Sequence, residues 1–141
     1  MLDKTIEEIT SELLTRSGLN VPVSLENRFP NGRLVGGKYN LGTRSITMYL
    51  DTVKEQCQLL FGSISHYLNY YAIVLAHELG HATDESLAAI ADLLAVANEA
   101  ESRKLLRMAE EKAWEAAREL VFDIDEGLFA KVRDTALDMH R

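Results

Sequence analysis

The distribution of glycine and proline divides this chain into an early and a late part. Four of the eight glycines fall between Gly32 and Gly42, whereas the interval between Gly80 and Gly127 contains neither glycine nor proline. That interval is rich in Ala, Leu, Glu, Lys and Arg, which are strong helix formers. The sequence therefore predicts an α+β fold, in which a small early β-sheet is followed by a mainly helical remainder.

The start of the chain has the pattern of an amphipathic helix followed by a short strand. Apolar side chains recur at helical spacing in residues 3–17, and Gly18 is the expected helix stop. Residues 21–25 then alternate apolar with small or polar side chains. Pro22 favours an edge position in the sheet, because proline cannot donate a backbone hydrogen bond.

A second strand pattern follows the glycine-rich stretch. In residues 44–50 every second side chain is apolar, which is the period of a half-buried strand. Residues 38–41 are expected to pair with this strand through a turn near Gly42.

Length and composition limit the classes of protein to consider. The 141 residues suit one domain spanning 1–141, and the net charge of −7 argues against a nucleic-acid partner. The single cysteine, Cys57, allows no internal disulfide and favours a reducing compartment. The start of the chain lacks the pattern of a signal peptide, and the longest apolar run, residues 70–76, is too short to span a membrane. We therefore expect a cytoplasmic protein.

Residues 77–81 read His-Glu-Leu-Gly-His, an HExxH motif. On a helix, His77 and His81 lie on one face a single turn apart, so that both imidazoles can bind one metal ion. Zinc suits these nitrogen ligands and lowers the pKa of a bound water molecule. Glu78 is placed to take the proton of that water. The motif predicts metal-assisted hydrolysis of a peptide or other acyl bond.

Two histidines leave a zinc ion short of a third protein ligand. The extended HExxHxxGxxH pattern fails, because Asp84 and Leu87 occupy the positions of its glycine and its third histidine. An acid from a later helix is the remaining source. Glu110 is the leading candidate, because it shares a helix face with apolar residues and so points inward. Glu111, about 100° around the helix, is the alternative.

This assignment requires the chain to reverse direction. If residues 83–121 formed one straight helix, Glu110 would lie 29 residues beyond His81, roughly 44 Å away. The weakest stretch for helix lies between Asn98 and Ser102, and either residue is a good N-cap for a returning helix.

The motif helix is expected to end within residues 80–82. Thr83 would then cap the next helix, and Asp84 and Glu85 would favour its N-terminal dipole. A metal-binding or metal-supporting role for these two acids is the alternative.

The motif and its surroundings resemble the gluzincin metallopeptidases, and among them the small ImmA/IrrE-like group of bacteria and their mobile elements. The resemblance covers an N-terminal helix, a short glycine-bracketed sheet, the motif at 77–81, and a later helix. In that helix, Glu110 and Ala113 match the start of the group's ExxA[ND] pattern. The resemblance implies a zincin-like domain with the HExxH helix at its core.

The resemblance also implies roles for individual residues. His77, His81 and Glu110 would bind zinc, and Glu78 would be the general base. A substrate strand would add to an exposed sheet edge near the metal, which we expect at residues 44–50.

Two features depart from the group's pattern. Trp114 stands where the group commonly has Asn or Asp to support a zinc histidine, and no helix-turn-helix is visible beside the zincin-like region. The group that stabilises the oxyanion is also not identified by the pattern. Its candidates are His66, Tyr67, Tyr70, Tyr71, Arg118 and His140.

The sequence thus predicts a cytoplasmic, zinc-dependent peptidase that acts on a protein or peptide substrate. The alternative is a zinc-stabilised interaction or regulatory module without turnover.

Overall fold

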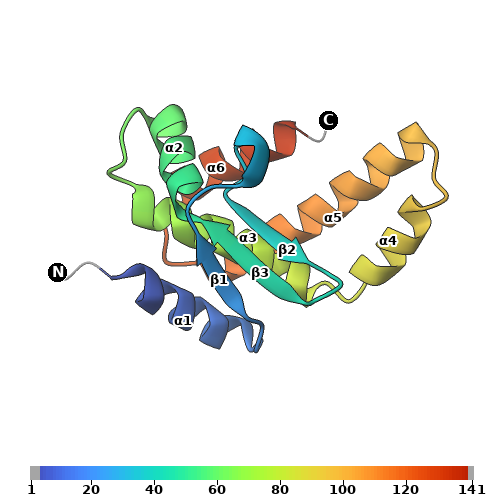
Figure 1. Ribbon diagram of the computed structural model, residues 1–141, viewed down its shortest axis with the longest axis horizontal. Helices are drawn as coiled ribbons and strands as arrows, with labels where there is room; N and C mark the ends of the chain where they lie inside the picture. The colour runs from blue at the N-terminus through green and yellow to red at the C-terminus, as the bar shows by residue number, and fades with distance from the viewer. Residues whose placement is uncertain (1–3, 140–141) are drawn as a thin grey trace.

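The computed structural model describes residues 4–139, and Figure 1 shows the arrangement of the elements. The helices are α1 (Ile6–Ser17), α2 (Leu50–Phe61), α3 (Tyr67–Thr83), α4 (Leu87–Leu94), α5 (Glu99–Leu120) and α6 (Glu126–Asp138). The strands are β1 (Val23–Glu26), β2 (Gly37–Asn40) and β3 (Ser45–Tyr49), and a 3-10 helix, η1, spans Pro30–Gly32. An early sheet and later helices confirm the predicted α+β class.

Helix α1 confirms the predicted amphipathic helix. Thr5 caps its first turn in a capping box with Glu8, and Gly18 ends it in the left-handed conformation, with φ of 70°. Ile9 and Leu13 are buried and belong to the hydrophobic core. The stripe seen in the sequence is therefore the face that packs on the rest of the molecule.

The three strands form one sheet with the order β1-β3-β2. β1 pairs in parallel with β3, and Val23 lies opposite Ile46. β2 pairs antiparallel with β3, as predicted for residues 38–41, and Gly37 lies opposite Met48. The edge position expected for the strand at Pro22 is also confirmed.

The prediction of a free sheet edge at residues 44–50 is wrong. β3 is the central strand and pairs with a neighbour on each side. Ile46 and Met48 are fully buried, as the alternation predicted, but a buried face does not determine whether a strand has one neighbour or two. The last residue of the predicted strand, Leu50, begins α2 instead. Within residues 4–139, the strand that contacts α3 and has an unpaired outer edge is β2.

Helix α3 lies at the centre of the molecule. It contacts α1 and α2, the strands β2 and β3, and the helices α5 and α6 (Figure 1). Its buried residues are Tyr70, Tyr71, Ala72, Ile73, Leu75, Ala76, Glu78, Leu79 and Gly80. Burial on most sides explains the continuous apolar run before the motif.

The chain reverses where the sequence predicted. Asn98 caps α5 in a capping box with Glu101, and Figure 1 shows α4 and α5 as an antiparallel pair. The predicted cap at Thr83 is wrong, because α3 continues through that residue, whose hydroxyl donates to the carbonyl of Gly80. The turn before α4 is instead held by Asp84, which accepts hydrogen bonds from Ser86.

Among residues 4–139, no helix combines the length and apolar character that crossing a bilayer requires.

Candidate metal centre

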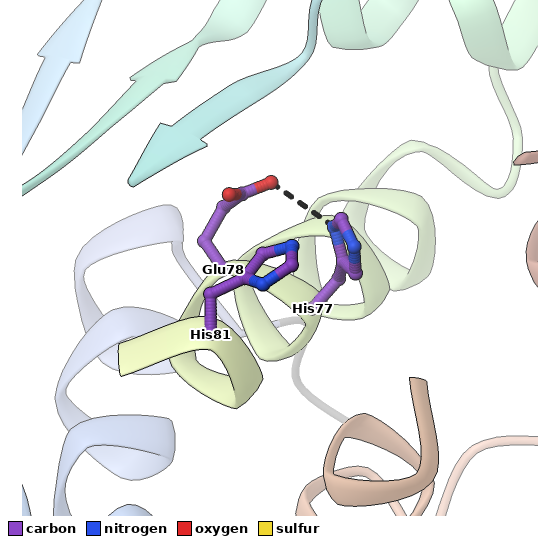
Figure 2. A group of neighbouring side chains, drawn as sticks. All are labelled: His77, Glu78 and His81. Atoms are coloured by element: carbon purple, nitrogen blue, oxygen red, sulfur yellow. Dashed lines mark hydrogen bonds and ion pairs between the residues drawn. The ribbon is translucent and has the colours of Figure 1, made fainter. Parts of the chain in front are cut away.

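The second half of α3 presents the motif side chains beside the sheet. His77 and His81 lie on one side of the helix with ring centroids 4.7 Å apart, and Glu78 points toward the strands (Figure 2). The side chains of the two histidines are 14% and 13% exposed, and Glu78 is buried. Their ligand atoms all lie within 4.8 Å of one another. Helical spacing alone accounts for this grouping.

Helix α5 adds Glu110 to the two histidines. Its Oε2 lies 2.6 Å from Nε2 of His77, and its Oε1 lies 3.2 Å from Nε2 of His81. Glu111 instead accepts a hydrogen bond of 2.6 Å from Arg107 on the exposed side of α5. The structure thus brings the leading candidate to the histidines and places the alternative elsewhere.

Charge and burial oppose each other at these groups. Burial by itself lowers the pKa of His77, but the carboxylates of Glu78 and Glu110 outweigh it and raise that pKa to about 10. Burial also acts to raise the pKa of Glu110, but hydrogen bonds from His77 and His81 hold it well below its usual range. Hydrogen bonds to the charged carboxylate of Glu110 therefore hold its side chain against those of His77 and His81.

The donor set of two imidazoles and a carboxylate is one that zinc accepts. Two ligands at about 2.0–2.1 Å from a zinc ion lie roughly 3.3 Å apart in a tetrahedron. Oε1 of Glu110 lies 3.2 Å from Nε2 of His81, which is near this spacing, but the other oxygen, Oε2, lies 2.6 Å from Nε2 of His77, so the carboxylate would have to move to admit an ion between the three side chains. A zinc ion held by two imidazole nitrogens and one carboxylate would have a fourth position left for water or another ligand.

The outer strand β2 lies directly over Glu78. A Cβ placed on Gly37 would lie 3.1 Å from Cγ of Glu78, 3.2 Å from Cγ1 of Val74 and 2.8 Å from Sδ of Met48. Gly37 therefore lets the strand approach the motif helix. The sequence offered only a weak signal, a glycine pair at 36–37, whose role could not be inferred without the packing of β2 on α3.

Trp114 packs against the first histidine of the motif. Its ring stacks on that of His77 with centroids 4.4 Å apart and 17° between the planes. The sequence marked Trp114 only as a departure from the pattern of the resembling group. Its position one turn after Glu110 is the signal that could have predicted this contact.

The described candidates for an oxyanion-stabilising group are engaged elsewhere. Tyr71 shares a hydrogen bond with Thr10 of α1, and Arg118 donates to the carbonyls of Phe122 and Ile124. The remaining candidates lie at or near the start of α3, where His66 and Tyr70 pack against Phe61 and Tyr67 lies under Lys54. His140 lies outside the described residues.

Asp84 and Glu85, the other acids weighed for the site, differ in their surroundings. One carboxylate oxygen of Asp84 accepts from the backbone and hydroxyl of Ser86, whereas Glu85 is exposed. The contacts of Asp84 are those of a turn-stabilising residue.

Comparison of the chain with protein-family models, curated proteins and solved structures finds no match.

Proposed function

We propose that this protein is a zinc-dependent peptidase. The observation that carries the proposal is the meeting of Glu110 from α5 with His77 and His81 from α3, at distances of 2.6 and 3.2 Å. These residues are far apart in sequence, and together they supply a donor set typical of catalytic zinc. When bound, zinc would supply Lewis-acid chemistry, polarising a water molecule and the carbonyl of the scissile bond.

Glu78 is the general base in this proposal. Its buried carboxylate lies beside the metal ligands, and its Oε2 is 3.1 Å from Nδ1 of His77. It would take a proton from the attacking water and return it to the leaving amine as the peptide bond breaks. The contact of Gly37 with Glu78 limits the space around this carboxylate and keeps it near the ligands.

An extended peptide is the substrate that the surroundings favour. β2 pairs with β3 on one side only, and it lies over the motif helix at Gly37. Its outer edge offers backbone donors and acceptors for a further strand beside Glu78. The edge expected at residues 44–50 is thus replaced by the edge at 37–40.

The remaining parts of the proposal follow from the resemblance and the composition. We place the chain with the gluzincins, in a zincin-like fold similar to that of the ImmA/IrrE-like group of bacteria and phages. The lone buried cysteine, Cys57, favours the cytoplasm.

One contact favours a second candidate, an inactive zinc-stabilised interaction module. In the hydrogen bond between Glu78 and Nδ1 of His77, the carboxylate fixes the orientation of the imidazole. If that bond persists with substrate present, Glu78 supports a ligand instead of moving protons.

The variant Glu78→Gln separates the two functions. Both proteins are first assayed for bound zinc by elemental analysis, and then incubated with a labelled unfolded protein and with a peptide library. A peptidase predicts cleavage by the wild type and at least about 10²-fold slower cleavage by the variant, with zinc retained in both. Equal substrate loss in both proteins, or no cleavage by zinc-loaded wild type, contradicts the peptidase. Absence of zinc from both contradicts both candidates.

A further inference from the structure

The imidazole of His77 contacts two other rings and has a partner at each of its nitrogens. Trp114 stacks on one face with 17° between the ring planes, and the ring of His81 approaches edge-on at 68°. Nδ1 faces Glu78 and Nε2 faces Glu110. Tilting the ring out of its present plane would therefore disturb the stack with Trp114 and the contacts of both nitrogens.

Trp114 is itself held by helix α6. It is 4% exposed, and the fully buried ring of Phe129 packs against it edge-on at 5.8 Å. The guanidinium of Arg118 covers Phe129 at 4.8 Å. The indole is thus buried against a fully buried ring of α6.

The indole nitrogen has no part in holding Trp114. Nε1 is buried and has no hydrogen-bond partner among the described residues. A buried tryptophan usually finds such a partner. What the side chain contributes here is the flat surface that it presents to His77.

We infer that Trp114 is a positioning residue that sets the orientation of the His77 imidazole for metal binding. The inference rests on the proposed zinc site. Rotation of a histidine ring about χ2 is soft, and turning it would carry Nε2 away from Glu110. In most metal sites a hydrogen bond to the other ring nitrogen prevents this. Here that partner is Glu78, which catalysis requires to be free to move a proton, so a stacked ring supplies the restraint instead.

The variants Trp114→Phe and Trp114→Leu test whether zinc affinity depends on a flat ring at position 114. Zinc affinity is measured by competition with a chromophoric chelator, and the free energy of unfolding by urea. A positioning role predicts affinity within about 3-fold of wild type for Phe, and a loss of about 10- to 100-fold for Leu. Trp114→Met is the second apolar variant, used if Trp114→Leu does not fold, and it should show the same loss. Equal affinity in wild type and in the folded Leu or Met variant overturns the inference.

A matched control separates positioning from general core stability. Leu13 is 2% exposed and packs α1 on the core, and α1 contributes none of the proposed zinc ligands. Leu13→Ala should lower stability but leave zinc affinity within about 3-fold of wild type. If Leu13→Ala loses as much zinc affinity as Trp114→Leu, then zinc affinity depends on core stability in general. That result overturns the inference.

Quenching of tryptophan fluorescence by a bound metal ion is a measurement that does not depend on how well the core is filled. Trp114 is the single tryptophan of the chain, so its emission reports on the stack with His77. Titration of the zinc-free protein with Co²⁺ should quench the emission in proportion to bound metal, up to one equivalent. Stoichiometric Co²⁺ binding with unchanged emission overturns the stacked arrangement, while failure of the wild type to bind either metal contradicts the proposed function itself.

Discussion

Gly80 of α3 lies in direct contact with the backbone of Ala113 of α5. A Cβ placed on Gly80 would lie 2.3 Å from the carbonyl oxygen and 2.9 Å from Cα of Ala113, closer than packed atoms allow. The glycine inside the HExxH motif is therefore the point of closest approach of the two helices. Because Glu110 is one turn before Ala113, this approach brings its carboxylate to the histidines.

The variant Gly80→Ala should separate α3 from α5. The added methyl group meets backbone atoms that cannot rotate away, so we expect a loss of about 3 kcal/mol in the free energy of unfolding. Zinc affinity should fall about 10-fold or more, because Glu110 moves with α5. Gly127→Ala is the control, since the nearest atom there, Oδ2 of Asp125 at 3.2 Å, belongs to a side chain and not to the backbone of a packed helix. Urea unfolding and chelator competition measure both effects; unchanged values for Gly80→Ala would contradict the close packing.

Glu110→Ala and Glu111→Ala should differ in their effect on metal binding. Glu110 contacts both histidines, whereas Glu111 pairs with Arg107 on the exposed side of the same helix. Loss of a ligand should weaken zinc binding by about 10²-fold or more, and loss of the exposed pair should leave it unchanged. Isothermal titration of the zinc-free proteins measures this. A larger loss in Glu111→Ala than in Glu110→Ala would exclude the assignment of the third ligand.

The variant Gly37→Ala should affect catalysis more than metal binding. The new methyl group would press on Cγ of Glu78 at 3.1 Å and on Sδ of Met48 at 2.8 Å, and no atom of either histidine is among the three nearest to it. We expect kcat to fall about 10-fold or more with zinc affinity within about 3-fold of wild type. Gly42→Ala, in the turn between β2 and β3, is the control. Equal kcat in both variants and wild type would show that β2 does not restrain Glu78.

The ion pair between Arg16 and Asp123 should make stability depend on pH. Hydrogen bonds from Arg16 hold the pKa of Asp123 below its usual value. A lowered pKa adds stability above the unfolded value of about 3.9, and this stability is lost as the pH falls through the folded pKa. Because Asp123 is 46% exposed, Asp123→Asn should cost only about 0.5–1 kcal/mol at pH 7.

Urea unfolding of the wild type and Asp123→Asn at several pH values checks this prediction. The difference in free energy between the two proteins should shrink between about pH 4 and pH 2. In an Arg16→Met background the same substitution should have a much smaller pH-dependent effect, because the hydrogen bonds from Arg16 are the main cause of the lowered pKa. A difference that stays constant across this range would show that the pair does not link stability to pH.

Patterns within short stretches of the sequence correctly predicted several helices and the placement of the two histidines. The stripe in residues 3–17 predicted α1, the cap at Asn98 predicted the start of α5, and the spacing of His77 and His81 predicted that they share a helix face. Each of these depends on residues within a few turns of one another, where helical geometry leaves few choices.

What the sequence alone determined is therefore the α+β class, the reversal before α5, and the pairing of two histidines with a nearby glutamate. The tertiary structure decided which strand is the sheet edge, and it brought Glu110 rather than Glu111 to the histidines. It also placed Gly37 over Glu78 and Trp114 on His77. These outcomes depend on the order of strands in the sheet and on how closely two helices pack, and neither follows from the periodicity of a single segment.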